Sequence, residues 1–188
     1  MVTPIFGISE RGGVSSAGAP RADGECLRYR LDVIAASPVD VVQSAGGWLY
    51  DRVMAGWEVT VLLAGSSDTR PLRILGARGV ELESVMGSTS QSLAVSAAAF
   101  TSDARVRDMV LESLDSPLVE VALWGHAGQG WPLGVNRATT RAQHVLSAAA
   151  RTFKAHALAA AGIGCDSVGP TEALLCDSRV DSELIRLD

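Results

Sequence analysis

The sequence predicts an α/β fold: a single domain with a mainly parallel or mixed sheet of about four to six strands and helices on both faces. Two observations support it. Short apolar runs bounded by Gly, Ser and Pro alternate with segments whose apolar residues recur at helical spacing. One run, Glu58–Ala64, is almost continuously apolar, as in a strand covered on both faces. The 188 residues suffice for one domain with a substantial core.

Composition divides the chain into three segments. Residues 1–24 are rich in Gly, Ser, Pro and Arg, and we expect a flexible leader; no basic start precedes an apolar run, as a signal peptide would require. Residues 25–164 hold the alternating pattern and are expected to form the α/β domain. Residues 165–188 contain six acidic residues and two arginines, and we expect this acidic tail to pack on the domain.

The first half of the domain has clear local signals. Cys26–Ala36 alternates apolar and polar residues, as a strand does. The next residues, Ser37–Asp40, offer a cap, a proline at the first helical position and an acid in the first turn. This helix should end near Met54, before the strand at 58–64. A short helix is favoured over a hairpin strand at Pro71–Leu75, and Gly79–Glu83 is expected to be a third strand.

The second half is expected to contain more helix. Helical patterns cover Gln91–Phe100 and Ala104–Leu114, and Leu118–Trp124 is expected to be a strand. A long helix is predicted from Asn136 to Ala161, because apolar residues recur there at spacings of three and four. A short strand is expected at Ala173–Cys176.

Ligands of such folds bind beyond the carboxyl ends of the strands. This rule selects four segments as candidate binding loops: Ala36–Asp40, Gly65–Arg70, Ser84–Ser90 and Gly125–Gly134.

The glycine-rich loop, Gly125–Gly134, is the strongest candidate for a ligand site. Its glycines would allow close backbone approach to a ligand, and the arginines that follow would supply positive charge. Exposed amides at the start of the predicted helix would favour an anion. There are two alternatives to an anion site. The acidic tail could fold back and pair with the arginines of this helix, or the arginines could simply be solvated. The proposed binding residues are Gly125, His126, Gly128, Gly130, Arg137 and Arg141.

His126 is the best candidate for acid–base chemistry, because it follows directly on a predicted strand and imidazole titrates near neutral pH. Asp40 or Asp68 could meet it across the sheet edge. A structural or solvated histidine is the alternative. No metal site or cofactor is expected, since the histidines and the three cysteines lack ligand spacing.

Bulk properties restrict the function. A net charge of −5 argues against non-specific nucleic-acid binding, and no apolar run is long enough to span a membrane. Fifteen arginines beside one lysine are typical of a GC-rich bacterial genome, and the sparse cysteines fit the cytoplasm. With no reaction motif, the sequence slightly favours a non-catalytic protein-interaction module, chaperone-like or an oligomer subunit. The alternative is a domain or enzyme that binds an anionic small molecule, a nucleotide or sugar phosphate, at the glycine-rich loop.

Overall fold

The computed structural model describes residues 29–65, 67–84, 92–116, 119–125, 139–177 and 185–186. Its centre is an eight-stranded sheet in the order β3-β2-β1-β4-β5-β7-β6-β8. The strands are β1 (Arg30–Ala35), β2 (Glu58–Leu63), β3 (Arg78–Glu81), β4 (Ser92–Ser96), β5 (Glu120–Trp124), β6 (Thr139–Val145), β7 (Thr171–Asp177) and β8 (Ile185–Arg186). The helices are α1 (Pro38–Met54), α2 (Arg70–Ile74), α3 (Ala97–Ser102), α4 (Ala104–Asp115) and α5 (Ala148–Ala160), with a 3-10 turn at Leu82–Ser84.

The α/β class is confirmed, but the sheet is larger than predicted and mixed. Strands β3, β2, β1, β4 and β5 are parallel to their neighbours, whereas β7 runs antiparallel to β5 and to β6, and β8 antiparallel to β6. The additional strands include β4 and β6, which lie where the sequence predicted helices.

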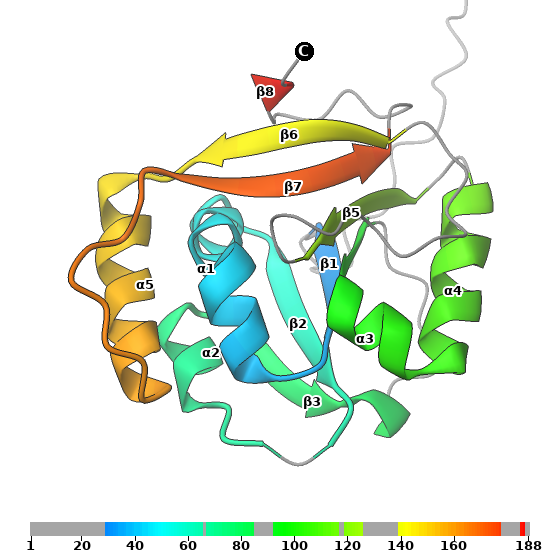
Figure 1. The fold of residues 1–188 in the computed structure, drawn as a ribbon, viewed down its shortest axis with the longest axis horizontal. Helices are drawn as coiled ribbons and strands as arrows, with labels where there is room; N and C mark the ends of the chain where they lie inside the picture. The colour runs from blue at the N-terminus through cyan, green and yellow to red at the C-terminus, as the bar shows by residue number, and fades with distance from the viewer. Residues whose placement is uncertain are drawn as a thin grey trace, which may run out of the picture.

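Helices cover both faces of the sheet, as predicted. Helices α1, α2 and α5 lie together on one face, and α3 and α4 on the other (Figure 1). Two apolar cores result, and successive residues of one strand alternate between them: Val61 of β2 belongs to the first core and Leu62 to the second. Because both faces of β2 are covered, its sequence is a continuous apolar run.

Local signals fixed the first helices correctly. Ser37 caps α1, its Oγ accepting from the Asp40 amide at 3.2 Å, with Pro38 at the first helical position. The helix ends at Met54 as predicted, and α2 confirms a helix at Pro71–Leu75. None of the helices in the described ranges is long and apolar enough to cross a membrane.

Two helix predictions are wrong. Residues 92–96 form β4, so the helix predicted at Gln91–Phe100 begins only at Ala97. The helix predicted at Asn136–Ala161 is β6 followed by α5. In both places a serine, Ser96 or Ser147, caps the real helix by accepting an amide three residues later at 3.0 Å. Small apolar residues fit either period, and sheet neighbours decide between them.

The tail does more than pack on the domain. Its strand β7 lies inside the sheet between β5 and β6, which confirms a strand at Ala173–Cys176 and extends it. The division into leader, domain and tail stays a prediction, and the leader, residues 1–24, lies outside the described residues.

The cap of α4 makes a pH-dependent contribution to stability. The Asp103 carboxylate accepts from the amide of Arg105 at 2.8 Å and pairs with its guanidinium at 3.0 Å. Hydrogen bonds from the Arg105 side chain, and then its amide, hold the pKa of Asp103 below its ordinary value. The pKa of Asp103 is therefore lower in the folded protein than in the unfolded chain. The stabilisation is fully present at pH values above the pKa of the unfolded chain, and it is lost as the pH falls through the pKa of the folded protein.

We therefore expect Arg105→Ala to raise the pKa of Asp103 in a carbon-13 NMR titration. The stability difference between wild type and variant should shrink at acidic pH. Arg107→Ala, two residues after Arg105 on the same helix, is the control and should leave the Asp103 titration in place. An unchanged Asp103 titration in Arg105→Ala would contradict the assignment.

Candidate functional site

The sheet has a topological switch point at the carboxyl ends of β1 and β4. These strands are neighbours in the sheet, but the chain builds β2 and β3 on the far side of β1 before it returns to β4. The segments that leave β1 and β4 therefore diverge, and such switch points are where open α/β sheets bind ligands. Ser37–Asp40 follows β1, Ser96 ends β4, and Trp124 ends β5 at the same edge.

Asp40 is the chemically notable residue at this edge. It lies in the first turn of α1, and one carboxylate oxygen, Oδ1, accepts from the indole N–H of the buried Trp124 at 3.3 Å. The other oxygen, Oδ2, is buried and has no hydrogen-bond partner among the described residues. A buried acceptor without a partner costs about 1–3 kcal/mol, so this oxygen is positioned to take a hydrogen bond from a bound molecule.

The start of α1 favours a hydrogen-bond donor opposite Asp40. The positive end of the 17-residue α1 stabilises a carboxylate in its first turn. Pro38 has no N–H, and the Asp40 amide is already bonded to Ser37. At the described start of this helix, the group available to a bound molecule is therefore mainly the carboxylate of Asp40 and not a set of free backbone amides. It suits an N–H or O–H group better than a phosphate.

Gly125 brings the end of β5 close to the start of α3. A Cβ added at Gly125 would lie 2.7 Å from the Cβ of Ala97, closer than such atoms approach in proteins. The sequence predicted that this glycine lets backbone approach a ligand. The described contact is with Ala97 of α3, and it explains the glycine without a ligand.

We expect Gly125→Ala to destabilise the protein by about 1–3 kcal/mol, the usual cost of overpacking. The matched variant Gly125→Ala/Ala97→Gly removes the opposing Cβ and should recover most of that loss relative to Ala97→Gly alone. Urea unfolding of the four proteins measures the coupling. Additive effects would mean that the two positions do not clash.

The other predicted site residues are only partly described. His126, Gly128, Gly130 and Arg137 lie outside the described residues. Arg141 is exposed on β6, and its register partner on the neighbouring strand β7 is Leu175. Residues 139–145 form the strand β6, so the helix predicted from Asn136 does not run through them, and a helix terminus gives no reason for an anion at Arg141. A ligand-binding role for these residues stays a prediction.

The candidate binding loops predicted from the sequence included Ala36–Asp40. They did not include the end of β4, because the sequence predicted a helix there. Of Ser84–Ser90, only Ser84 is described, at the end of the 3-10 turn. At Gly65–Arg70, Asp68 pairs with Arg70 at 2.7 Å in solvent. Asp40 was recognised in the sequence only as a helix-turn acid and a partner for His126; its position directly after the first strand was the available signal.

One serine, histidine and aspartate cluster has a structural role. His144 Nε2 lies 2.8 Å from Asp51 Oδ2, and Ser147 Oγ donates to Asp51 Oδ1 at 2.6 Å. The aspartate contacts both partners, whereas a nucleophilic triad places the histidine between the other two. The cluster joins the end of α1 to the cap of α5.

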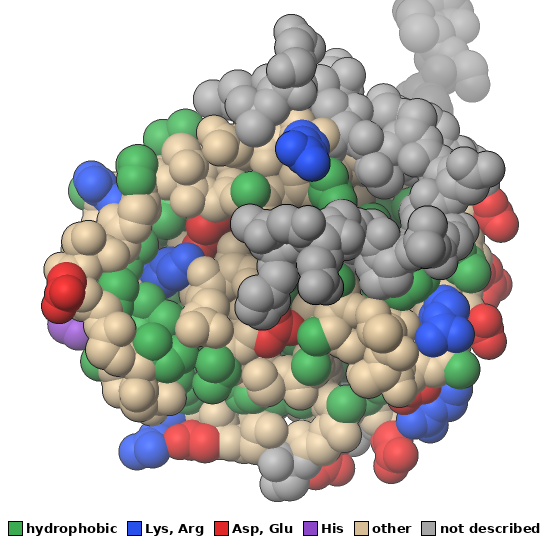
Figure 2. All heavy atoms as spheres, in the orientation of Figure 1, with side chains coloured by type: hydrophobic (Ala, Val, Ile, Leu, Met, Phe, Trp, Pro, Cys, Tyr) green, Lys and Arg blue, Asp and Glu red, His purple; other side chains and the backbone are tan. Residues whose placement is uncertain are grey.

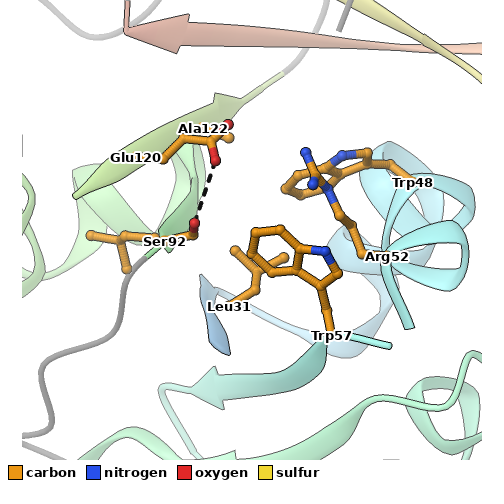
Figure 3. A pocket seen from close by; sticks show the side chains of 8 residues that line it. Leu31, Trp48, Arg52, Trp57, Ser92, Glu120 and Ala122 are labelled. Carbon is orange, nitrogen blue, oxygen red and sulfur yellow. Dashed lines mark hydrogen bonds between the residues drawn. The ribbon is translucent and has the colours of Figure 1, made fainter. Parts of the chain in front are cut away.

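The opposite edge of the sheet has a small enclosed space lined by two tryptophans (Figure 3). The Arg52 guanidinium lies 4.5 Å from the ring centre of Trp57 and 5.7 Å from that of Trp48, and it faces Ser92 and Glu120. The cavity measures about 10 Å³, room for about one water. It lies at the amino ends of the parallel strands and is too small for a substrate.

Within the described ranges, no group of three or more His, Cys, Asp or Glu side chains could hold a metal ion. Cys165 is exposed, Cys176 is buried, and Cys26 lies outside the described residues. The described donor set therefore does not fit a metal centre.

No family model and no curated protein sequence matches the chain. Solved structures do match its fold. The antimicrobial pseudoaglycone deacetylase Dbv21 is 16% identical with a TM-score of 0.59, covering 82% of this chain and 100% of its own. The zinc-inhibited form of teicoplanin deacetylase Orf2 is 14% identical with a TM-score of 0.56, covering 85% and 99%. Its teicoplanin complex has the same identity and coverage with a TM-score of 0.55.

These likenesses correct the functional prediction. At 14–16% identity they establish a shared fold, and the solved proteins that carry it are deacetylase enzymes of small molecules. The prediction of a non-catalytic, chaperone-like or protein-binding module is therefore wrong. The small-molecule alternative agrees better with the fold, whereas a protein partner finds no support. The chain is an α/β protein with the fold of these deacetylases.

Proposed function

We propose that the protein is a hydrolase that removes an acyl group of about acetyl size from a nitrogen of a small molecule, with its site at the switch point between β1 and β4. The observation that carries the proposal is the buried, unpartnered Oδ2 of Asp40 at this switch point. The likeness to structures of deacetylases supports the choice of reaction.

In this proposal Asp40 is the general base. Its Oδ2 takes a proton from a water molecule, and the water oxygen bonds to the acyl carbon. The carbon–nitrogen bond then breaks, and the departing amine takes up the proton that Asp40 received. The products are a carboxylic acid and an amine. The indole of Trp124 fixes the carboxylate through Oδ1 and leaves Oδ2 for the water.

The glycine-rich segment would complete the site. The chain enters it at Gly125, whose backbone lies beside Ala97 at the start of α3, and His126 is the next residue in the sequence. We propose His126 as the second acid–base group and Gly128, Gly130, Arg137 and Arg141 as residues that contact the rest of the substrate. The carboxylate of Asp40 makes an amide N–H or hydroxyl the group expected opposite it, in place of the phosphate that the sequence suggested.

The test is acetate release from a panel of N-acetylated small molecules, including acetylated amines of increasing size and teicoplanin, with heat-inactivated protein as the blank. Enzyme-dependent acetate from any member supports the proposal, and its rate across the panel ranks substrate size. A folded protein that releases no acetate from any member overturns the proposal.

A further inference from the structure

A buried ion pair joins α5 to β7. Lys154, the only lysine beside fifteen arginines, is 7% exposed, and its partner Glu172 is 5% exposed. The ammonium donates to Glu172 Oε1 at 2.5 Å and to the backbone carbonyl of Gln43 at 2.7 Å. In a chain whose other basic residues are all arginine, a compact ammonium suits this confined position.

The pair makes hydrogen bonds to the backbone of α1. Glu172 Oε1 accepts from the amide of Gly47 at 2.9 Å, and Oε2 accepts from that of Trp48 at 2.7 Å. In a regular helix the Gly47 amide donates to the Gln43 carbonyl, which here takes a hydrogen bond from Lys154. The two side chains thus contact the donor and the acceptor of one regular helical hydrogen bond. Side chains that enter such a ladder bend helices.

The surroundings accommodate the pair. A Cβ at Gly47 would lie 2.5 Å from Leu146 Cδ2, so α1 and the segment before α5 are in close contact here. A cavity of about 310 Å³, lined by Lys154 and Gln43 among others, opens beside the pair. Figure 2 shows a basic and an acidic side chain in the hollow between α1 and α5.

We infer that Lys154 and Glu172 are positioning residues for Asp40. The contacts of the pair lie between the first turns of α1, which carry Asp40, and the later turns that begin at Gly47. The same strand β7 that holds Glu172 also pairs with β5, which ends at Trp124. Strand β7 therefore contacts the elements that carry both partners of the Asp40–Trp124 hydrogen bond: α1 through Glu172, and β5 through strand pairing. The catalytic consequence rests on the proposed function; the positioning does not.

A buried ion pair is a weak device for stability, because well-packed apolar residues often serve as well or better. This permits an experiment that separates stability from position. In Lys154→Met/Glu172→Leu no buried charge is left alone, and the Gly47 amide can return to the Gln43 carbonyl. The variant should keep stability near that of wild type while the first turns of α1 change direction.

The readout is the indole N–H resonance of Trp124 in a nitrogen-15 NMR spectrum, assigned with Trp124→Phe. We expect this resonance to move in the double variant. As a control, Val110→Ala removes apolar contacts in the second core, on the other face of the sheet; it should lose stability without moving the resonance. If the double variant is unfolded, Glu172→Gln, which leaves one of the two amides without its acceptor, should move it.

A Trp124 resonance that coincides with wild type in a folded double variant, or in Glu172→Gln where the double variant is unfolded, overturns the inference. If wild type releases acetate, the variant should also have a lower kcat with little change in KM, because substrate contacts remain while Asp40 is displaced. If wild type releases none, the NMR result still decides the positioning role, so the two failures are distinguishable.

Discussion

Replacing Lys154 alone with methionine is expected to lower the free energy of unfolding by about 3–5 kcal/mol. Methionine matches the length of the side chain but removes the charge, which leaves the Glu172 carboxylate buried opposite an apolar group. Glu172 would keep the amides of Gly47 and Trp48, and the Gln43 carbonyl would lose its donor. Urea unfolding, with midpoint and slope both fitted, measures the loss.

Arg151→Met is the matched control for this experiment. Arg151 lies one turn away on the same helix and is exposed, so its loss should change stability by no more than about 0.5 kcal/mol. A Lys154→Met protein as stable as this control would mean that the ion pair is not desolvated as the structure has it. A large loss in the single variant beside a small one in the double variant would demonstrate the coupling of the two charges.

The second large effect is expected on catalysis. Asp40→Asn should lower the rate of acyl hydrolysis by about 10²–10⁴-fold, the usual contribution of a general base. The amide keeps an oxygen that can accept from Trp124, so the fold should persist, but it cannot take a proton from water. Steady-state acetate release by wild type and variant measures the effect, and the circular dichroism of both proteins confirms that they are folded.

Asp68→Asn is the control for this second prediction. Asp68 is another carboxylate after a strand, but it is exposed and paired with Arg70. Its replacement should leave acetate release unchanged. If Asp40→Asn retains more than about a tenth of the wild-type rate, Asp40 is not the base, since general-base removal costs more than that.

The comparison of sequence and structure separates two kinds of site residue. Asp40 stands in a local motif, because the serine, proline and acid after the first strand announce both a helix start and a carboxyl edge. Lys154 and Glu172 stand in no motif. Their relation depends on β7 entering the sheet beside β5, and the only signal in the sequence was a single lysine among the arginines.

By itself the sequence determined the α/β class, the limits of α1, the strand β2 and a candidate edge that includes Asp40. These features depend on caps, turn residues and apolar periodicity within a few residues of each other. Only the tertiary structure decided that residues 92–96 and 139–145 are strands and that the tail supplies an inner strand. Segments rich in small residues satisfy both the helical and the strand period, so neighbours distant in the chain decide. The buried ion pair follows the same rule, because burying two charges is tolerable only once β7, α5 and the backbone of α1 meet around them.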